Sequence, residues 1–175
     1  MLQYDTYEST VGTLWLTEED GVLKGISFSA DCAVDIPRTV GTEFAPVKQW
    51  LDDYFQGIPR KIDFQIAPSG TSFQKLIWDL LMEIPFGETC SYGQLAKQAV
   101  QLLGKENMSP QAVGQAAGRN PIAIIIPCHR VIGSDGKLTG YAYGLDRKQW
   151  LLCHEQKQEV TQCAMQNSDR LKQNG

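Results

Sequence analysis

The sequence predicts an α+β protein of two small domains joined by a short linker. Strand-like and helical patterns alternate over the first 67 residues, whereas helical patterns dominate from Thr71 onward. Between the two parts, residues 67–70 (Ala-Pro-Ser-Gly) have the composition of a linker. A chain of 175 residues can bury one good core or two small ones. We therefore expect an N-terminal α+β domain over residues 1–67, a mostly helical C-terminal domain over 71–157 and a polar tail over 158–175.

The N-terminal part has the pattern of a hairpin followed by a helix. Residues 11–28 contain two strand-like runs, with the strong turn signal Asp20-Gly21 between them. From Pro46 to Phe55 apolar residues recur at helical spacing, and Gly57 ends the pattern. A later alternating run predicts one added strand, with apolar residues at Ile62, Phe64 and Ile66. Nothing in this part indicates chemistry.

The C-terminal part contains three well-marked helix starts. The pairs Thr71–Gln74 and Ser91–Gln94 each have the spacing of a capping box, which satisfies free backbone N–H groups at a helix start. Ser109-Pro110 combines an N-cap residue with proline at the first helical position. The helices that begin at the last two signals are consistent with a helix-turn-helix, although helix pairs occur in most helical domains.

The last of these helices consists almost wholly of small residues from Gln111 to Gly118. A helix that reads the major groove of DNA carries long side chains that reach base edges, whereas small residues let one backbone approach another closely. From the residues alone, the favoured interpretation is a helix packed tightly in the core, where Ala and Gly serve equally well.

The pentapeptide Pro-Cys-His-Arg-Val at residues 127–131 is the strongest chemical signal. The apolar, mostly β-branched run Ile122–Ile126 predicts a buried strand or buried extended segment, which Pro127 ends. Cys128 is therefore expected at the end of a core element, beside an imidazole and a guanidinium. Such a thiol can become a thiolate nucleophile. The alternative is that Cys128 is a small buried hydrophobic residue, as most free cysteines are.

Charge and composition limit the partners. The net charge is −4, but residues 1–65 hold five Lys/Arg against eleven Asp/Glu, whereas residues 66–155 hold eight against seven. The C-terminal part can therefore face phosphates without strong repulsion, and we expect modest affinity for nucleic acid. The apolar runs are too short for a bilayer and the first residues have no signal core, so we expect a cytoplasmic protein with no membrane partner. With no Cys-x-x-Cys pair and two histidines, both in the C-terminal part, we expect no metal and no cofactor.

Several short motifs surround the cysteine in a fixed order. They are Phe86-Gly87-Glu88, Ser91-Tyr92, Ala112-Val113-Gly114, Asn120-Pro121, the pentapeptide, Gly140-Tyr141 and Leu151–Glu155. In this order and at these intervals the sequence resembles the O6-alkylguanine-DNA alkyltransferase family, over 71–155 and more loosely over the N-terminal part. The resemblance implies a ribonuclease H-like N-terminal domain and a winged-helix-like C-terminal domain.

The resemblance also implies suicide DNA repair. The protein flips O6-alkylguanine, with O4-alkylthymine as a second candidate, out of double-stranded DNA and transfers the alkyl group irreversibly to its own Cys128. Because the resulting thioether resists water, each molecule is expected to act once. His129 takes the thiol proton through a water molecule and Glu155 orients the imidazole. Tyr92 donates to the departing base, and Asn120 braces the catalytic turn.

Pocket and DNA contacts follow from the same resemblance. The implied pocket residues are Ala117, Val131, Tyr141, Ala142 and Tyr143. The implied DNA-binding residues of a monomer, whose small-residue helix lies in the minor groove, are Gln111, Ala112, Gly114, Gln115 and Arg130.

Three features depart from the family pattern. Gln111 stands where an arginine usually fills the gap left by the flipped base, so we expect weaker flipping. Residues 101–107 lengthen the link between the two helices. Tyr143 is bulky where small residues are also common, which predicts restricted access for large O6 substituents.

Other functions remain as alternatives. A Cys-His hydrolase would use the same dyad, but it leaves the helix pair and Asn120-Pro121 unexplained. A non-catalytic lesion binder of the alkyltransferase-like kind lacks the cysteine that is present here. A DNA-binding regulator with the same C-terminal domain is expected to need a further cysteine-rich domain.

Overall fold

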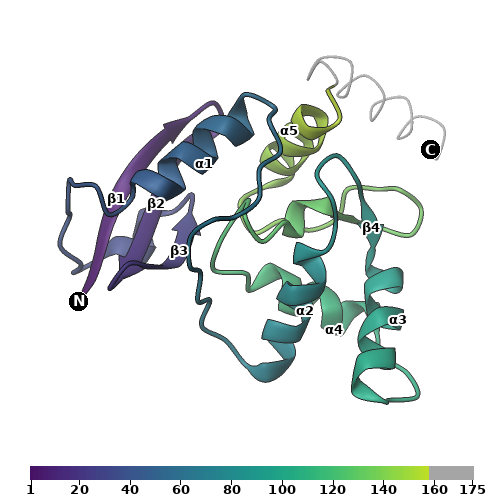
Figure 1. The fold of residues 1–175 in the computed structure, drawn as a ribbon. Coiled ribbons are helices and arrows are strands. Elements are labelled where there is room, and N and C mark those ends of the chain that lie inside the picture. Colours follow the sequence, from purple (N-terminus) through teal and green to yellow (C-terminus); the bar gives the residue numbers. More distant parts are fainter. Residues whose placement is uncertain (158–175) are drawn as a thin grey trace.

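A sheet covered by one helix forms the N-terminal domain, and a helical C-terminal domain lies beside it (Figure 1). This computed structural model describes residues 1–157, so the predicted polar tail lies outside the described residues. The two-domain α+β architecture expected from the sequence is confirmed. Within the described range, no helix is long and apolar enough to cross a membrane.

The N-terminal sheet has three antiparallel strands, β1 (Leu2–Ser9), β2 (Gly12–Glu19) and β3 (Val22–Ser27), in that order. The predicted hairpin is β2 with β3, and its turn residues Asp20 and Gly21 have φ of 52° and 81°. Both lie in the left-handed region that such turns need. Strand β1 is an addition to the prediction. Its fully inward residue is the carboxylate Asp5, which does not fit an alternating apolar pattern.

Helix α1 (Ala45–Phe55) lies over this sheet, and the short 3₁₀ turn η1 (Ala30–Ala33) precedes it. It buries the predicted apolar face, namely Val47, Trp50, Leu51 and Tyr54, while Phe55 stays partly exposed. The helix ends just before Gly57, whose φ of 79° suits glycine. The added strand predicted around Ile62, Phe64 and Ile66 is reduced to a single parallel bridge between Ile66 and Leu23.

The C-terminal domain is built from helices and one short parallel ladder. Its elements are α2 (Ser72–Met82), β4 (Cys90–Ser91), α3 (Tyr92–Leu103), α4 (Pro110–Gly118), the 3₁₀ turn η2 (Cys128–Arg130), β5 (Val131–Ile132) and α5 (Leu145–Glu155). Both predicted capping boxes are present, and the Ser109 side chain caps α4. Helices α2, α3 and α4 pack together. The indole N–H of Trp78 donates to the Ala116 carbonyl at 2.9 Å and holds α4 against α2.

The apolar run Ile122–Ile126 is buried as predicted, but it forms neither of the two predicted shapes, a strand or an extended segment. Only Ile122 pairs with a strand, in a bridge to Ile26 of β3. The chain then turns back, with a hydrogen bond from Ile126 N to Ile122 O at 3.1 Å. Ile124 has a φ of 70°, a strained value for a β-branched residue. A run this apolar is buried whether it forms a strand or a turn. Here the turn itself and strand β3 supply the hydrogen-bond partners of its backbone.

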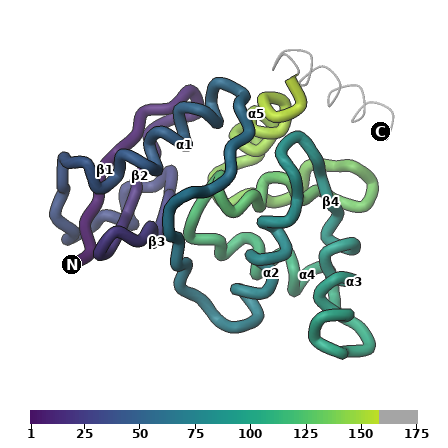
Figure 2. The backbone as a smooth tube through the Cα atoms, viewed as in Figure 1, coloured from purple at the N-terminus to yellow at the C-terminus, as the bar shows by residue number. Residues whose placement is uncertain are grey.

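The two domains share one hydrophobic cluster. Backbone hydrogen bonds join them directly, from Ile26 N to Pro121 O at 3.0 Å and from Ala123 N to Ile26 O at 2.9 Å. Figure 2 shows the other contact that matters for the site, because the last described helix, α5, lies next to the end of α1. Residues far apart in the sequence therefore meet behind the catalytic turn.

Candidate active site and nucleic-acid interface

Cys128 opens the short turn η2 directly after Pro127, and its side chain is partly buried. Its Sγ accepts a hydrogen bond from Asn120 Nδ2 at 3.3 Å. Asn120 also donates to Ile126 O at 2.7 Å and accepts from Ile122 N at 2.9 Å. The amide side chain thus connects both ends of the isoleucine turn to the sulfur, in the bracing position that the resemblance implies.

The environment of the thiol favours its neutral form. Burial raises the pKa of Cys128, while the Asn120 hydrogen bond and the charge of Lys148 act in the opposite direction. A nucleophilic thiolate at this position therefore requires a base that removes the proton.

His129 is fully buried and its two ring nitrogens differ in their surroundings. Nε2 bonds to the Oε2 atom of Glu155, whereas Nδ1 has no hydrogen-bond partner among the described residues. Because a carboxylate accepts hydrogen bonds, we assign the proton to Nε2 and the free lone pair to Nδ1. Burial lowers the pKa of His129, although Glu155 opposes the shift. The imidazole is therefore neutral at neutral pH and can accept a proton at Nδ1.

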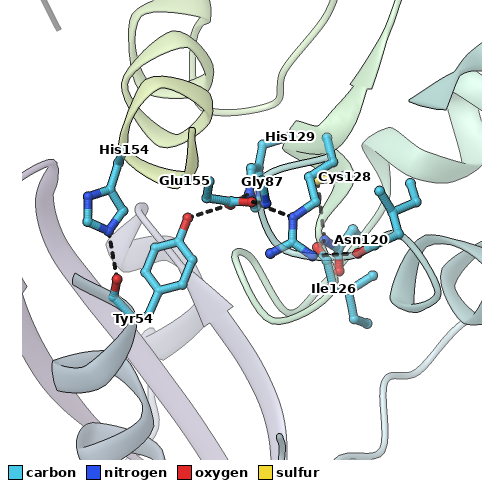
Figure 3. Close-up of polar contacts among 10 residues, drawn as sticks. Tyr54, Gly87, Asn120, Ile126, Cys128, His129, His154 and Glu155 are labelled. Atoms are coloured by element: carbon cyan, nitrogen blue, oxygen red, sulfur yellow. Dashed lines mark hydrogen bonds and ion pairs between the residues drawn. The ribbon is translucent and has the colours of Figure 1, made fainter. Parts of the chain in front are cut away.

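Glu155 lies at the end of α5 with every side of its carboxylate occupied (Figure 3). Oε1 accepts from Arg130 Nε at 2.6 Å and from Gly87 N at 3.2 Å. Oε2 accepts from His129 and from the hydroxyl of Tyr54, which lies 2.7 Å away. Burial favours the neutral acid, but the charges and hydrogen bonds of His129 and Arg130 outweigh it and hold the pKa of Glu155 at about 2. The group is a carboxylate at any physiological pH.

Arg130, which was expected to contact DNA, points into the protein. Its side chain is 10% exposed, and besides Glu155 it donates to the Ile84 carbonyl at 2.7 Å. A guanidinium held by two buried acceptors is not available to a phosphate. Arg130 instead compensates the charge of Glu155 inside the protein.

Lys148 on α5 is a buried cation that the sequence analysis did not single out. It is 0% exposed, and its Nζ donates to the carbonyls of Thr139 and Gly140 at 3.0 and 3.1 Å. In the part of the chain that the structure describes, no carboxylate lies within ion-pair distance of it. Burial lowers the pKa of Lys148 to about 8, with Cys128 opposing. Lys148 therefore holds the loop around Gly140 and adds positive potential near the sulfur.

A cavity of about 120 Å³ opens in front of the sulfur. It is lined by Tyr92, Gly114, Ala117, Gly118, Cys128, Gly140, Tyr141 and Ala142. Three of the five implied pocket residues, Ala117, Tyr141 and Ala142, are in this lining. Tyr92 reaches across it, and its hydroxyl donates to the Thr139 carbonyl at 3.0 Å.

Two implied pocket residues lie outside this lining. Val131 is fully buried in β5, where it pairs with Cys90. Tyr143 lies behind the wall, with its ring centroid 5.7 Å from that of Tyr141 and 5.0 Å from that of Phe28. Any influence of Tyr143 on the pocket must therefore pass through Tyr141.

Helix α4 presents its small residues in two directions. Val113, Ala116 and Ala117 are buried, which agrees with close packing in the core. Gln111 and Gln115 are exposed and Ala112 is partly exposed, so the outer face is open to a partner. Gly114 belongs to α4 and also lines the pocket. A Cβ added at this glycine would lie 3.5 Å from the Tyr92 ring. Core packing of this helix, favoured from the residues alone, and the groove contact that the resemblance implies are therefore compatible.

Three residues of the site escaped the sequence analysis in different ways. Gly87 was part of a motif without a role, and Tyr54 appeared only as one apolar position of a helix. Lys148 had a detectable signal, because it shares the i, i+3, i+4, i+7 spacing of one helix face with Leu151, Leu152 and Glu155. Among the described residues, no group of three or more His, Cys, Asp or Glu side chains is arranged to hold a metal ion.

The fold and the site define a class of protein with a cysteine nucleophile, a buried His–Glu pair and a small pocket walled by an exposed helix. Residues 2–68 match the model of the 6-O-methylguanine DNA methyltransferase, ribonuclease-like domain. Residues 72–157 match the model of the 6-O-methylguanine DNA methyltransferase, DNA binding domain. A methylated-DNA–protein-cysteine methyltransferase of Methanosarcina acetivorans is 44% identical over 155 residues, covering 86% of this chain and 96% of that protein. One of Mycolicibacterium paratuberculosis is 44% identical over 161 residues, covering 90% and 94%.

Solved structures agree with the sequence matches. The O6-methylguanine methyltransferase of Mycobacterium tuberculosis has a TM-score of 0.79 and 38% identity, over 91% of this chain and 95% of that one. The structure of OGT from the same organism in complex with DNA has a TM-score of 0.80 and 37% identity, over 92% and 98%. The chain therefore belongs to the 6-O-methylguanine DNA methyltransferase family, and the resemblance stated from its motifs is confirmed.

Proposed function

We propose that this protein is a methylated-DNA–protein-cysteine methyltransferase that repairs O6-alkylguanine in double-stranded DNA, as a monomer and once per molecule. The observation that carries the proposal is the position of Cys128. Cys128 lines a small cavity whose other walls come from Tyr92 of α3, from α4 and from residues 140–142. A base flipped from a duplex bound against α4 would enter this cavity directly.

Transfer of the alkyl group follows from the hydrogen-bond geometry. The thiol proton passes through a water molecule to Nδ1 of His129, whose Nε2–H stays on Glu155. The Cys128 thiolate attacks the alkyl carbon, so an S–C bond forms while the C–O6 bond breaks and its electron pair stays on the base. Tyr92 releases the Thr139 carbonyl and donates a proton toward the ring nitrogen where negative charge develops. The guanine leaves neutral and the cysteine remains as a thioether, while the Tyr92 phenolate takes up a proton from solvent and the His129 imidazolium gives one back to solvent.

Mass spectrometry tests the proposal directly. The intact protein is mixed with excess O6-methylguanine duplex, and we expect a gain of one methyl group on the Cys128 peptide. Cys90→Ala, which removes another free thiol of the described residues, should still gain the methyl group. Cys128→Ala should bind DNA without any mass gain. A protein that binds the lesion without gaining mass would instead be a lesion binder, and turnover of an ester or peptide would favour a Cys-His hydrolase.

The exposed face of α4 is the proposed contact with the minor groove. Gln111 is exposed at the start of the helix, where it can enter the gap left by the flipped base. It adds no positive charge there, so we expect Gln111→Arg to bind DNA about fivefold more tightly at low salt and to react faster. Binding titrations and single-turnover rates measure both effects. Unchanged affinity and rate would remove this role for Gln111.

Tyr143 is the proposed limit on substituent size. Its hydroxyl lies 3.3 Å from Ser27 Oγ, and its ring supports Tyr141 from behind. We therefore expect slower transfer of benzyl than of methyl groups, with a smaller difference in Tyr143→Ala. Equal rates for both adducts in the wild-type protein would contradict this proposal.

A further inference from the structure

Tyr54 brings the N-terminal domain into the catalytic hydrogen-bond network. It belongs to α1 and is 2% exposed. Its hydroxyl donates to Glu155 Oε2 at 2.7 Å, across 101 positions of sequence. Figure 3 shows the phenol pointing from α1 toward the carboxylate at the end of α5.

The hydroxyl shares one oxygen atom with the proposed base. Both Tyr54 and His129 bond to Oε2 of Glu155, whereas Arg130 and Gly87 bond to Oε1. A donor on the same oxygen withdraws negative charge from it and fixes its direction. Tyr54 therefore acts on the atom that orients the imidazole.

The ring of Tyr54 is held so that its hydroxyl has little freedom. It stacks on Trp50 with centroids 5.5 Å apart, and meets the edge of Phe86 at 5.8 Å. His154 Nε2 bonds to the Tyr54 carbonyl at 2.6 Å and joins α5 to α1 a second time. Aromatic packing from both domains thus aims the phenol at Glu155.

We propose that Tyr54 is a positioning residue, which holds Glu155 against His129 and sets the basicity of the imidazole that deprotonates Cys128. The inference rests on the proposed methyl transfer. Through Glu155, it gives the N-terminal domain, in which the sequence indicated no chemistry, a part in the reaction.

The direction of the effect follows from the groups around the imidazole. Burial lowers the pKa of His129, Glu155 raises it, and the cations of Arg130 and Lys148 lower it further. Loss of the Tyr54 donor leaves more negative charge on Oε2, which stabilises the imidazolium and raises the pKa of His129. Since the neutral imidazole is the base, activity is then lost at a higher pH as the solution is acidified.

The decisive comparison uses two Tyr→Phe variants. Tyr54→Phe keeps the ring and removes only the hydroxyl. Tyr7→Phe is the matched control, because the Tyr7 hydroxyl likewise donates to a carboxylate at 2.7 Å. That carboxylate is Asp52 of the N-terminal domain, and it does not bond to Glu155. For Tyr54→Phe we expect single-turnover transfer about tenfold slower at neutral pH, because Glu155 no longer holds the imidazole in one direction. We also expect an acidic limb shifted upward by about one pH unit. Affinity for lesion DNA should stay unchanged, and Tyr7→Phe should match the wild type.

A second measurement does not depend on transfer. The chain has two histidines, so an NMR titration in the absence of DNA can follow His129 separately from His154. The pKa of His129 should rise in Tyr54→Phe and fall when the more acidic 3-fluorotyrosine replaces Tyr54. The fluorinated protein keeps the whole side chain, so it decides the matter even where Tyr54→Phe does not fold.

The outcomes separate the two proposals. A wild-type protein that never gains a methyl group refutes the proposed function, while the titration still judges Tyr54. A wild-type protein that transfers normally, with a rate profile and His129 pKa unaltered by either replacement of Tyr54, overturns the positioning role. The same profile shift in Tyr7→Phe would also overturn it, because the effect would then be a general loss of domain stability.

Discussion

The N-terminal domain buries the carboxylates of Asp5 and Glu18, and the C-terminal domain buries that of Glu155. Asp5 and Glu155 are held differently. Asp5 in β1 is 2% exposed and Glu155 in α5 is 3% exposed. Asp5 is bonded by Lys48 and Arg38, whose side chains are 34% and 53% exposed and reach in from solvent. The partners of Glu155 are themselves buried and include the imidazole of His129.

Both carboxylates have a lowered pKa for the same physical reason. Burial raises the pKa of Asp5, but its hydrogen bonds to Lys48 and to the backbone of Thr6 outweigh it. Glu155 follows the same balance with different donors. The difference is that the partners of Asp5 are a lysine and an arginine, whereas Glu155 bonds to His129, which can gain and lose a proton next to Cys128. The ion pairs of Asp5 therefore serve the fold alone. The pair of Glu155 with His129 serves a reactive site, because the titratable imidazole lies beside the nucleophile.

The largest effect is expected when the charge of each carboxylate is removed in turn. Glu155→Gln should slow methyl transfer at least about a hundredfold, because the imidazole loses the group that orients it and stabilises its charge. Asp5→Asn should leave the rate per folded molecule within about twofold, since it lacks any route to the sulfur. Single-turnover rates, corrected for the folded fraction by circular dichroism, measure both. A comparable loss in the two variants would show that the difference between the sites is not functional.

Acid unfolding gives the second contrast. The folded pKa of Glu155 is about 2 against an ordinary value of 4.5, so its stabilisation is fully present above the ordinary value and is lost as pH falls from about 4.5 to about 2. We expect about 2–3 kcal/mol from this group, at most, in that window. Urea titrations at several acidic pH values should show a flatter pH dependence in Glu155→Gln. The Asp5→Asn curve should flatten less, because the Asp5 partners are partly exposed and screened.

Two lysines provide the smallest and sharpest contrast. The folded pKa of Lys148 is about 8 against 10.5 when exposed, so the folded state prefers the neutral amine and stability rises as pH increases from about 8 to 10.5. Lys148→Met should remove this rise and be about 1–2 kcal/mol more stable at neutral pH. It should also transfer several-fold more slowly, because the carbonyls of Thr139 and Gly140 lose their donor.

The control for Lys148 is the lysine of the other domain. Lys48→Met removes a partner of Asp5, so it should be less stable than the wild type and keep its transfer rate. Thermal melts at neutral and alkaline pH and single-turnover rates distinguish the two. A Lys148→Met protein that is destabilised at neutral pH would mean that its hydrogen bonds outweigh the cost of burying the cation.

The sequence predicted the parts of the fold that depend on neighbours in the chain. The capping boxes at Thr71 and Ser91 and the Asp20-Gly21 turn form as expected, because each is decided by side chains a few positions apart. The isoleucine run was predicted to be buried, but not to turn. Its turn depends on β3, which meets it from the other domain.

For the site, the sequence by itself determined the chemistry: Cys128 and His129 in one pentapeptide, Asn120 in a turn motif and a helix of small residues. Only the tertiary structure decided how that chemistry is assembled. The resemblance had already implied that Glu155 orients His129, 26 positions away, but not that Tyr54 reaches Glu155 across 101 positions. The tertiary structure also places the side chains of Arg130 and Lys148 inside the protein. The physical reason is that such contacts depend on which faces of α1 and α5 meet. The packing of the whole core sets that choice, and no local spacing encodes it.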